Sequence, residues 1–390
     1  MKIMMVVGAR PNYMKAAPII KQMHRFADFL EPIIVHTGQH YDHILSEQIM
    51  SELGMPQPDI YLGVGSGTHA EQTANTMLEF ERILIADPPH LVAVFEDVNS
   101  TLACALVAAK CKILIAHVEA GLRSFDMSAP EEINRVLTDR VSDFLFPSES
   151  AAFQNLMNEG FDAGSVFYVG NTMIDSLTDR FTEAQTRPYP ENLDLKPKSY
   201  ALLTLHKPEN VDDFKIFRSI INAVGSFSDK MPVVFPAHPR TKLNIDKFEL
   251  SPYLERAGIK LIGPTGYLDF LKLESEAAFV MTDSGGVQDE TTFLNVPCLT
   301  LREITERPVT TIEGTNILVG RIPERIAAEA ERILGGNIKE GSKPKYWDGE
   351  AGKRIAETFI KIRQNLFEPE SIKDGTKKMK TVREIVTAGG

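Results

Sequence analysis

Short apolar runs alternate with amphipathic stretches along most of this chain, and that alternation narrows the folds it can adopt. In the first half, helical patterns such as residues 12–26 and 101–110 separate apolar runs of strand length. Strands that alternate with helices form parallel sheets with helices on both faces. The expected strands of this half are residues 2–7, 31–36, 91–96, 113–119, 144–147 and 166–169.

Residues 186–198 interrupt the alternation. They contain three prolines, several charges and no apolar period, which predicts a connection between two domains. A second series follows, with expected strands at residues 199–205, 233–237, 260–262, 277–282 and 297–301. The predicted fold class is α/β, with two Rossmann-like doubly wound domains that face a central cleft. The domains would span residues 1–185 and 199–366, and residues 367–390 would form a tail that packs back on or near the first domain.

Composition excludes several classes of protein. No apolar run reaches the roughly 18 residues of a membrane span, and residues 3–7 are predicted to be a buried strand rather than part of a signal peptide. A formal net charge of −11 argues against non-specific binding to nucleic acid or to anionic membranes. The three cysteines are scattered without a Cys-x-x-Cys pair, which argues against disulfides and fits a cytoplasmic compartment.

The turn at residues 8–11 (GARP) follows the first expected strand and precedes a helix. Small residues at a helix N-terminus expose backbone N–H groups to an anion, and Arg10 adds guanidinium donors suited to phosphate. Lys15 follows one to two helical turns later. The turn lacks the GxGxxG pattern of dinucleotide-binding proteins, and a plain turn with a solvated arginine explains it equally well.

Acidic residues gather where the central strands of the first domain are expected to end. Asp97 and Glu119 each close an apolar run, and Glu131 and Glu132 begin a helix. Carboxylates at the carboxyl edge of a parallel sheet can exchange protons with a substrate, because burial and mutual repulsion tune their pKa values. Structural explanations are a helix cap at Asp97, a pair between Glu119 and Arg123, and favourable charges at a helix start. The recurrence of acids at strand ends favours the functional interpretation.

Two histidine motifs occupy equivalent strand ends in the second domain, His206 in HKPEN and His238 in HPRT. A histidine at such a place can meet phosphate or assist proton transfer, although a single histidine is more often structural. Zinc is not favoured, because the only His-x-x-x-His spacing, between His36 and His40, straddles the end of a strand.

Residues 282–291 (TDSGGVQDET) form the most specific single motif. They lie between an expected strand and a helix, so the Ser-Gly-Gly amides can approach a diphosphate. Glu290, one turn into the helix, can accept both hydroxyl groups of a ribose. Residues 302–309 and 314–316 follow the next strand and should face the same sheet edge, although their charges also suit a solvated loop.

Taken together, the ordered motifs resemble one enzyme family. They are GARPNYMKAAPI, TGQHYD, HVEAGLRS, PEEINR, HPRT, TDSGGVQDET, TERPVT and GTN. In this order, and over nearly the whole chain, they resemble the non-hydrolysing UDP-N-acetylglucosamine 2-epimerases. The resemblance implies a GT-B-type fold, a homodimer, and interconversion of UDP-GlcNAc and UDP-ManNAc without NAD or a metal. It also implies that UDP leaves C1 as a base removes the C2 proton, giving 2-acetamidoglucal, to which UDP then re-adds.

The resemblance also assigns roles to matching residues. Asp97, Glu119 and Glu131 would be the acid–base set, and His206 would join them by meeting charge that develops on the diphosphate. The residues that would bind the diphosphate, ribose and uracil or close the site are Arg10, Lys15, His238, Arg240, Ser284, Gly285, Gly286, Glu290, Phe270, Arg307, Thr315 and Asn316. Ser284 to Gly286 would offer backbone amides, Glu290 would hold the ribose, and Phe270 would stack on uracil.

Several positions depart from the family pattern. Glu96 precedes Asp97 where many members have glycine, and it either raises the pKa of a neighbouring carboxyl or points away. Asp289 stands where members usually have the first of two glutamates, and Lys207-Pro208 stands where many bacterial members have two arginines. Residues 60–76 also differ, which leaves activation by UDP-GlcNAc at a second site open.

Four other functions stay open from the sequence. They are a 2-epimerase of another UDP-sugar such as a 2,3-diacetamido uronic acid, a hydrolysing epimerase that releases ManNAc and UDP, a glycosyltransferase of the same fold, and an inactive UDP-sugar-binding protein. The glycosyltransferase needs an acceptor site and explains the carboxylates less well.

Overall fold

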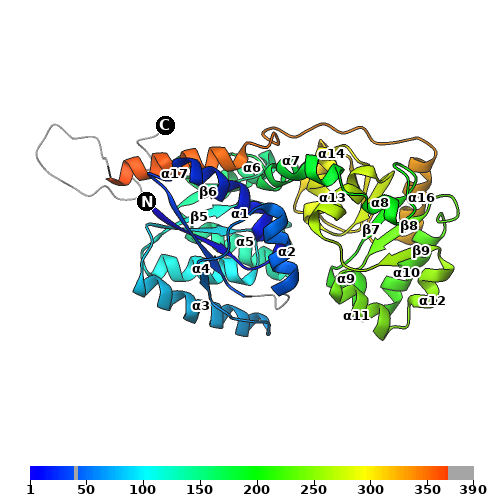
Figure 1. Ribbon diagram of the computed structural model, residues 1–390, viewed down its shortest axis with the longest axis horizontal. Coiled ribbons are helices and arrows are strands. Elements are labelled where there is room, and N and C mark those ends of the chain that lie inside the picture. The colour runs from blue at the N-terminus through cyan, green and yellow to red at the C-terminus, as the bar shows by residue number, and fades with distance from the viewer. Residues whose placement is uncertain (39–42, 368–390) are drawn as a thin grey trace, which may run out of the picture. The chain divides into compact units, whose positions relative to one another are not determined.

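The computed structural model describes residues 1–38 and 43–367, which form two compact units (Figure 1). Unit 1 joins Met1–Ser176 to the segment that begins at Lys345, and unit 2 is Leu177–Pro344. Among the described residues, no helix is both long and apolar enough to cross a membrane. The same part of the chain brings no three His, Cys, Asp or Glu side chains into an arrangement that could hold a metal.

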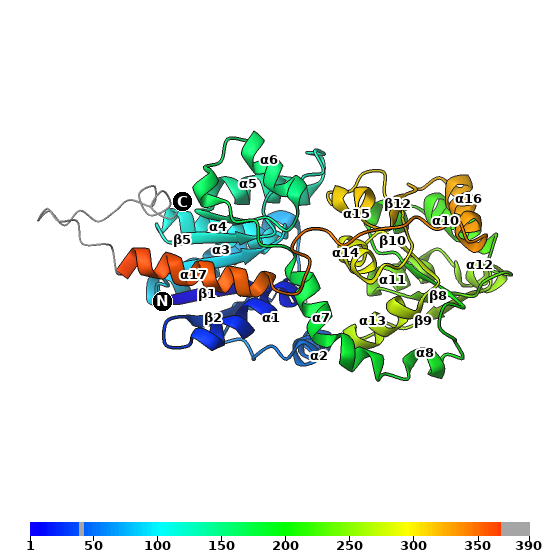
Figure 2. The same cartoon turned by 90° about the horizontal axis from the view of Figure 1, so that it is seen from above.

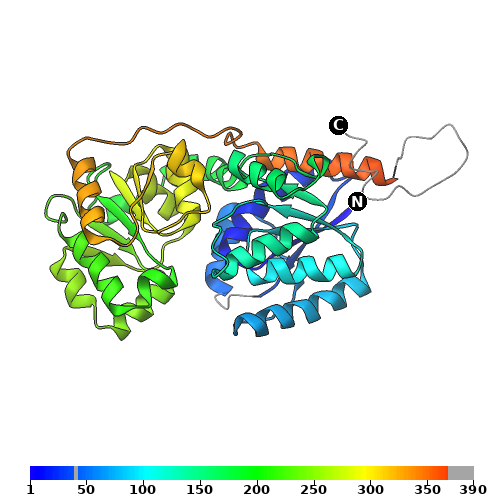
Figure 3. The same cartoon turned by 180° about the vertical axis from the view of Figure 1, so that it is seen from behind.

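Unit 1 is built on a six-stranded parallel sheet in the order β3-β2-β1-β4-β5-β6. Its strands are β1 (Lys2–Val7), β2 (Glu31–His36), β3 (Ile60–Tyr61), β4 (Leu91–Phe95), β5 (Leu114–Val118) and β6 (Phe144–Phe146). Its helices are α1 (Arg10–Met23), α2 (His43–Leu53), α3 (His69–Ala86), α4 (Asn99–Lys110), α5 (Pro130–Val141), α6 (Ser150–Asn158) and α17 (Ala351–Phe367), with the first residues of α7 (Thr172–Gln185). Helices α1 and α17 cover one face of the sheet, and α3 and α4 cover the other (Figures 1 and 3).

Unit 2 repeats the plan with the strand order β12-β11-β10-β7-β8-β9, again all parallel. Its strands are β7 (Ala201–Thr204), β8 (Val233–Pro236), β9 (Ile259–Ile262), β10 (Phe279–Thr282), β11 (Cys298–Thr300) and β12 (Asn316–Leu318). Its helices after α7 are α8 (Tyr189–Asn192), α9 (Pro208–Val211), α10 (Phe214–Gly225), α11 (Pro239–Lys247), α12 (Ser251–Arg256), α13 (Tyr267–Glu276), α14 (Gly285–Leu294), α15 (Pro308–Ile312) and α16 (Pro323–Leu334).

Both faces of the unit 2 sheet are packed against helices, with α10 and α16 on one face and α8 and α13 on the other (Figure 2). Consecutive residues of a strand therefore enter different cores. Leu203 packs in the cluster that includes Phe217 and Ile326, whereas Leu202 packs in the cluster that includes Leu273. This two-sided burial explains why the strands are continuous apolar runs rather than alternating patterns.

The predicted fold class is confirmed, with local differences. Residues 166–169, expected to be a strand, contribute only an isolated bridge between Val166 and Leu145. The edge strands β3 and β12 were not predicted, because two or three residues are too few to establish a strand period.

The division of the chain differs from the predicted boundaries at residues 185, 199 and 366. Helix α7 runs unbroken through the boundary at Ser176, and Tyr189 and Leu195 of the predicted linker pack against the unit 2 core. Helix α17 packs on α1 of unit 1, where a side chain at Gly352 would come within 2.9 Å of the Pro18 backbone. Apolar contacts therefore place the predicted linker in unit 2 and α17 in unit 1. Composition alone does not reveal such contacts. The predicted tail lies outside the described residues from 368 onward.

Asp175 of α7 binds the first residues of α17 through hydrogen bonds. Its buried carboxylate accepts hydrogen bonds from the backbone N–H groups of Ala351, at 3.1 Å, and Gly352, at 2.7 Å. Burial raises the pKa of Asp175 to about 7, even though these hydrogen bonds favour the charged form. The carboxyl group therefore titrates at a higher pH in the folded protein than in the unfolded chain.

We expect Asp175 to make the free energy of unfolding pH-dependent. Because its folded pKa lies above the unfolded value of about 3.9, its contribution is complete below that value and is lost as the pH rises through about 7. Relative to Asp175→Asn, the wild type should lose roughly 2–4 kcal/mol between pH 4 and pH 8. Urea unfolding at several pH values measures this. The exposed Asp179→Asn on the same helix is the control, and a parallel pH dependence in all three proteins would contradict the assignment.

Candidate functional site

Two acidic residues lie side by side at the carboxyl edge of the unit 1 sheet. Phe95 pairs with Val118 in the parallel ladder of β4 and β5, so the residues that follow, Glu96 and Glu119, end adjacent strands. Both have left-handed backbones, with φ of 59° at Glu96 and 73° at Glu119. Such a backbone is uncommon outside glycine and costs about 1–3 kcal/mol, and it is concentrated at functional sites.

Lys15 of α1 lies between these two carboxylates. Its side chain is 1% exposed, and its ammonium is ion-paired with Glu96 Oε1 and with Glu119 Oε2. Asn12 Nδ2 donates a hydrogen bond to the other oxygen of Glu96 at 3.2 Å. Burial raises the pKa of Glu96 to about 7, against the lowering effect of Lys15 and with a further rise from Glu119 and Asp97. This cluster therefore gains or loses a proton near neutral pH.

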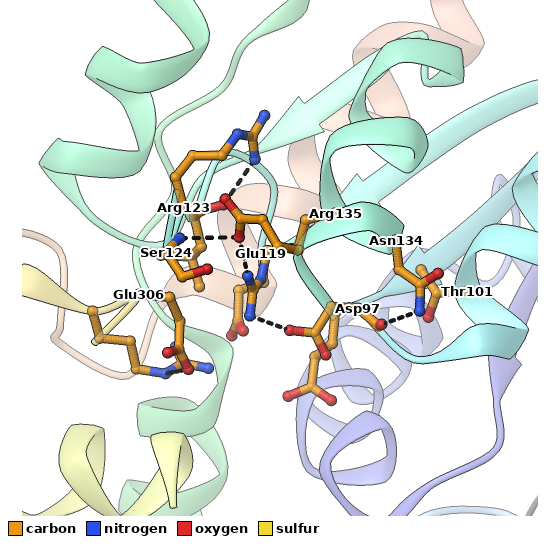
Figure 4. A network of polar contacts seen from close by, with 12 residues as sticks. Asp97, Thr101, Glu119, Arg123, Ser124, Asn134, Arg135 and Glu306 are labelled. Carbon is orange, nitrogen blue, oxygen red and sulfur yellow. Dashed lines mark hydrogen bonds and ion pairs between the residues drawn. The ribbon is translucent and has the colours of Figure 1, made fainter. Parts of the chain in front are cut away.

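Asp97 lies next to the cluster and is positioned by α5 (Figure 4). Arg135 NH2 lies 2.7 Å from Asp97 Oδ2, and Asn134 Nδ2 donates to the Asp97 carbonyl at 2.8 Å. The Asp97 side chain is 22% exposed, so a ligand can reach this carboxylate. Arg135 also pairs with the buried Glu132. Glu131, the preceding residue in the first turn of α5, is half-buried.

A buried ion-pair network behind the cluster fixes the two strand ends. His117 Nδ1 lies 2.6 Å from Asp139, and its Nε2 lies 2.9 Å from the backbone carbonyl of Glu96. These two contacts, one from each ring nitrogen, fix the orientation of the His117 ring. Burial would raise the pKa of Asp139, but the charges of His117 and Arg123 hold it below its usual value. Arg123 thus pairs with Asp139, at 2.7 Å, and not with Glu119.

The GARP turn differs from the expected open anion site. The backbone N–H groups of Gly8 and Ala9 both donate to Asn12 Oδ1, at 3.1 and 3.0 Å, so the chain itself occupies them. Glycine is required at position 8, because a Cβ there would lie 2.1 Å from Thr37 Oγ1. Arg10 begins α1 and its side chain is exposed.

Of the TGQHYD motif, residues 39–42 lie outside the described part of the chain.

In unit 2, the buried Asp283 organises the end of β10 and the start of α9. Its carboxylate accepts hydrogen bonds from the backbone N–H groups of His206 and Lys207 and from Asn210 Nδ2, each at 3.0 Å. His206 Nδ1 lies 3.0 Å from Asp283 Oδ1. Burial would raise the pKa of Asp283, but the His206 charge and these hydrogen bonds hold it below its usual value. The ring of His206, one-third exposed, is thereby fixed at the carboxyl edge of the sheet.

The HPRT motif is divided between two environments. The exposed His238 caps α11 by accepting a hydrogen bond from the Arg240 backbone N–H at 3.3 Å, and its ring centroid lies 5.6 Å from that of His206. The Arg240 guanidinium instead forms a surface ion pair with Asp212. The structure brings His238 to His206 but gives Arg240 a protein carboxylate as its partner.

The Ser-Gly-Gly motif forms a helix start, as predicted. Ser284 occupies the N-cap position of α14, without a capping hydrogen bond from its side chain, and the helix begins at Gly285. A Cβ at Gly285 would lie 2.7 Å from Arg307 Nε, so glycine allows the guanidinium to approach the helix start. Arg307 is buried and its NH1 lies 3.0 Å from Asp289. The Arg307 guanidinium and the positive end of the helix therefore meet beside Gly285, where the Glu306 carboxylate also approaches. A helix start with an arginine beside it suits an anion.

Glu290 of α14 forms a buried carboxyl pair with Glu274 of α13. Burial, together with the like charge of Glu290, raises the pKa of Glu274 well above its usual value. Glu274 therefore holds its proton to higher pH than an ordinary glutamate, and in its protonated form it can donate a hydrogen bond to Glu290. Glu274 could not be selected from the sequence, because an acid within an amphipathic helix is usually exposed.

Phe270, Thr315 and Asn316, which were predicted to bind the ligand, contact other residues of unit 2. Phe270 is 9% exposed and belongs to the unit 2 core. Thr315 Oγ1 donates to the Val296 carbonyl at 2.7 Å. Asn316 Nδ2 donates to Thr292 Oγ1 at 2.9 Å, so both polar side chains are engaged within the protein. Uracil stacking by Phe270 stays a prediction, whereas the contacts of Thr315 and Asn316 indicate a role in holding the end of α14.

The comparisons with known proteins agree on one family. A family model described as UDP-N-acetylglucosamine 2-epimerase matches residues 22–360. The UDP-N-acetylglucosamine 2-epimerase of Methanocaldococcus jannaschii is 42% identical over 361 residues, which cover 91% of this chain and 98% of that protein. A UDP-2,3-diacetamido-2,3-dideoxy-D-glucuronate 2-epimerase of Pseudomonas aeruginosa is 41% identical over 365 residues, covering 93% of this chain and all of that protein.

The structural comparison gives the same result. A crystal structure of the Methanocaldococcus jannaschii enzyme in complex with UDP-GlcNAc and UDP matches with a TM-score of 0.86 and 41% identity, covering 92% of this chain and 99% of that one. A Neisseria meningitidis enzyme bound to UDP-GlcNAc matches with a TM-score of 0.83 at 28% identity, covering 93% of this chain and 100% of that one. The two Rossmann-like sheets are thus those of a GT-B-type epimerase. This chain is an enzyme that belongs to the UDP-N-acetylglucosamine 2-epimerase family.

Proposed function

We propose that this enzyme interconverts UDP-GlcNAc and UDP-ManNAc by elimination and re-addition of UDP. A base removes the proton at C2, and the electron pair of that bond forms the C1=C2 double bond of 2-acetamidoglucal. UDP leaves C1 with the electrons of the C–O bond. When UDP re-adds, an acid returns a proton to the opposite face of C2, so no redox cofactor is needed.

The acid cluster of unit 1 is the observation that carries this proposal. Asp97 is accessible and held by Arg135, and Glu119 is buried against Lys15. Carboxyl groups in such different environments have different proton affinities, which suits one to donate and another to accept a proton. We assign Asp97, Glu119 and Glu131 to these transfers, without dividing them between the two faces of the sugar.

Unit 2 supplies groups suited to the departing UDP. His206, fixed by Asp283, can stabilise charge that develops on the diphosphate. The start of α14 offers Gly285 and Gly286 near Arg307, whereas the Ser284 backbone N–H donates to Thr282 Oγ1 at 3.0 Å. The paired Glu290 can accept hydrogen bonds from a ribose. Arg10, exposed at the start of α1, remains a candidate for phosphate.

A 2,3-diacetamido uronate is a second candidate for the sugar. The Pseudomonas aeruginosa relative named for that substrate is 41% identical, almost the same as the UDP-N-acetylglucosamine epimerase relatives. Both substrates carry an acetamido group at C2 and UDP at C1, so the same cluster suits either.

A cytoplasmic location remains a prediction.

We also propose that the enzyme is a homodimer. Helix α5 exposes Ile133 and Leu137, one turn apart, and α3 exposes Leu78 and Ile85. Exposed apolar side chains on two helices of unit 1 suit a face buried between two copies. Light scattering coupled to size exclusion gives the mass directly, and a monomer at micromolar concentration would contradict the dimer.

Proton NMR in D2O tests the reaction. With UDP-GlcNAc we expect deuterium at C2 and the signals of UDP-ManNAc. Asp97→Asn and Glu119→Gln should each slow the exchange at least about 100-fold, because each removes a group that transfers a proton. The exposed Asp28→Asn of unit 1 is the charge-matched control and should retain wild-type exchange.

Other outcomes distinguish the alternatives. UDP with free ManNAc would indicate a hydrolysing enzyme. Exchange with the diacetamido uronate but not with UDP-GlcNAc would identify the second candidate. Binding of UDP without exchange of either sugar would contradict the proposal.

A further inference from the structure

Glu96 occupies a position whose backbone favours glycine. Its φ of 59° lies in the left-handed region, where a Cβ is strained. The side chain is nevertheless buried and held at both oxygens, by Lys15 and by Asn12. A strained backbone and a buried charge both oppose folding, so contacts made by this carboxyl must offset them.

Glu96 and Glu119 both form ion pairs with the ammonium of Lys15. Lys15 is the one cation that contacts both Glu96 and Glu119 among the described ion pairs. Asp97, the next residue, adds a third carboxylate but has its own partner in Arg135. Behind the cluster, His117 contacts Glu96 at its backbone carbonyl and not at its carboxylate. Two buried carboxylates therefore share one ammonium, and a proton retained by one of them relieves their mutual repulsion.

We propose that Glu96 is a positioning residue for Glu119: by sharing the Lys15 ammonium, it makes the pair retain a proton that Glu119 alone beside Lys15 would lose. The raised pKa of Glu96, at about 7, is consistent with this arrangement. Such a pair titrates as a unit, in two steps that belong to neither carboxyl alone. The pair can thus supply or receive a proton at a pH where an isolated, ion-paired glutamate stays charged. Its catalytic use rests on the proposed function, but the sharing itself does not.

Titration of Glu119 tests the sharing without any substrate. Protein labelled with 13C at glutamate side-chain carboxyl carbons is followed by NMR against pH, with Glu119 and Glu96 assigned by their loss in Glu119→Gln and Glu96→Gln. In the wild type we expect two coupled steps, the later one near pH 7. In Glu96→Gln, which keeps the size of the side chain but not its charge, Glu119 should titrate in one step, about one pH unit lower.

Glu96→Gly is the second variant, because glycine adopts this backbone without strain. It should move Glu119 in the same direction as Glu96→Gln. Lys112→Gly is the matched control, since Lys112 is exposed and has the same φ of 59°. It should remove backbone strain and leave the titration of Glu119 unchanged. Unchanged titration of Glu119 in both Glu96 variants, or a shift to higher pH, would overturn the proposal.

The pH profile of kcat/KM then connects the sharing to the reaction. The side of this pH profile that depends on Glu119 should shift to lower pH by about one unit in Glu96→Gln. If the wild type shows no epimerisation but the NMR shift is present, the proposed function fails and the sharing stands. If epimerisation proceeds but neither the NMR titration of Glu119 nor the pH profile of kcat/KM shifts in Glu96→Gln, the proposed function stands and the sharing fails.

Discussion

Replacement of Lys15 by methionine is expected to destabilise unit 1 by about 3–5 kcal/mol and to reduce turnover at least about 100-fold. Methionine fills a similar volume but leaves Glu96 and Glu119 buried without their shared cation. The carboxyls will respond by holding protons to higher pH. Folded pKa values above the unfolded values mean that stability is present at low pH and is lost as the pH rises. The defect should therefore be larger at pH 8 than at pH 5.

Urea unfolding at both pH values, together with NMR of C2 exchange, measures these effects. The control is Lys21→Met, on an exposed position of the same helix, which removes the same charge. Equal losses in the two variants would show that net charge, and not the cluster, is responsible. A Lys15→Met protein of wild-type stability at pH 8 would contradict the buried pairing.

Asp283→Asn is expected to cost about 3–4 kcal/mol in unit 2 and to weaken UDP binding at least about 10-fold. The carboxylate accepts from two backbone N–H groups and from Asn210, and an amide would place its own N–H donors against some of them. It would also deprive His206 of its anionic partner. Because the pKa of Asp283 is lowered, its contribution is present at neutral pH and is lost as the pH falls through the lowered value.

Urea unfolding and calorimetric titration with UDP measure the two effects separately. Asp229→Asn, an exposed change in the same unit, should leave both near wild type. We expect the stability of Asp283→Asn to depend less on acid than that of the wild type. A variant that is less stable yet binds UDP normally would assign Asp283 to the fold alone and would contradict its role beside the diphosphate.

The sheets were predictable because their strands are buried on both sides. The strands β1 and β2 match the prediction from end to end, since each contains a continuous apolar run, residues 3–7 and 32–35. Residues 166–169 also form an apolar run, but they have no strand beside them beyond one bridge. The position of α17 was not predictable, because an amphipathic helix near a C-terminus can pack on any exposed apolar face.

The site was predictable in its residue types more than in its contacts. Asp97 and Glu119 follow from their place after apolar runs, but the direction of the Lys15 side chain does not, and the sequence assigned Lys15 to phosphate rather than to carboxylates. The left-handed backbones of Glu96 and Glu119 cannot be inferred from the residue type, because glutamate is not typical of this conformation. His117 and Asp139 could have been selected, since His117 lies two residues before Glu119 and Asp139 lies on the helix that carries Glu131.

The placement of α17 in unit 1 has a consequence for synthesis on the ribosome. Unit 2, Leu177–Pro344, is a continuous stretch inserted between two parts of unit 1. It can fold as soon as it emerges, whereas the face of α1 that α17 covers stays unshielded until Ala351–Phe367 has been translated. Unit 1, part of which precedes unit 2 along the chain, thus completes its structure after unit 2. Truncation before residue 351 would leave an apolar helix face open to aggregation.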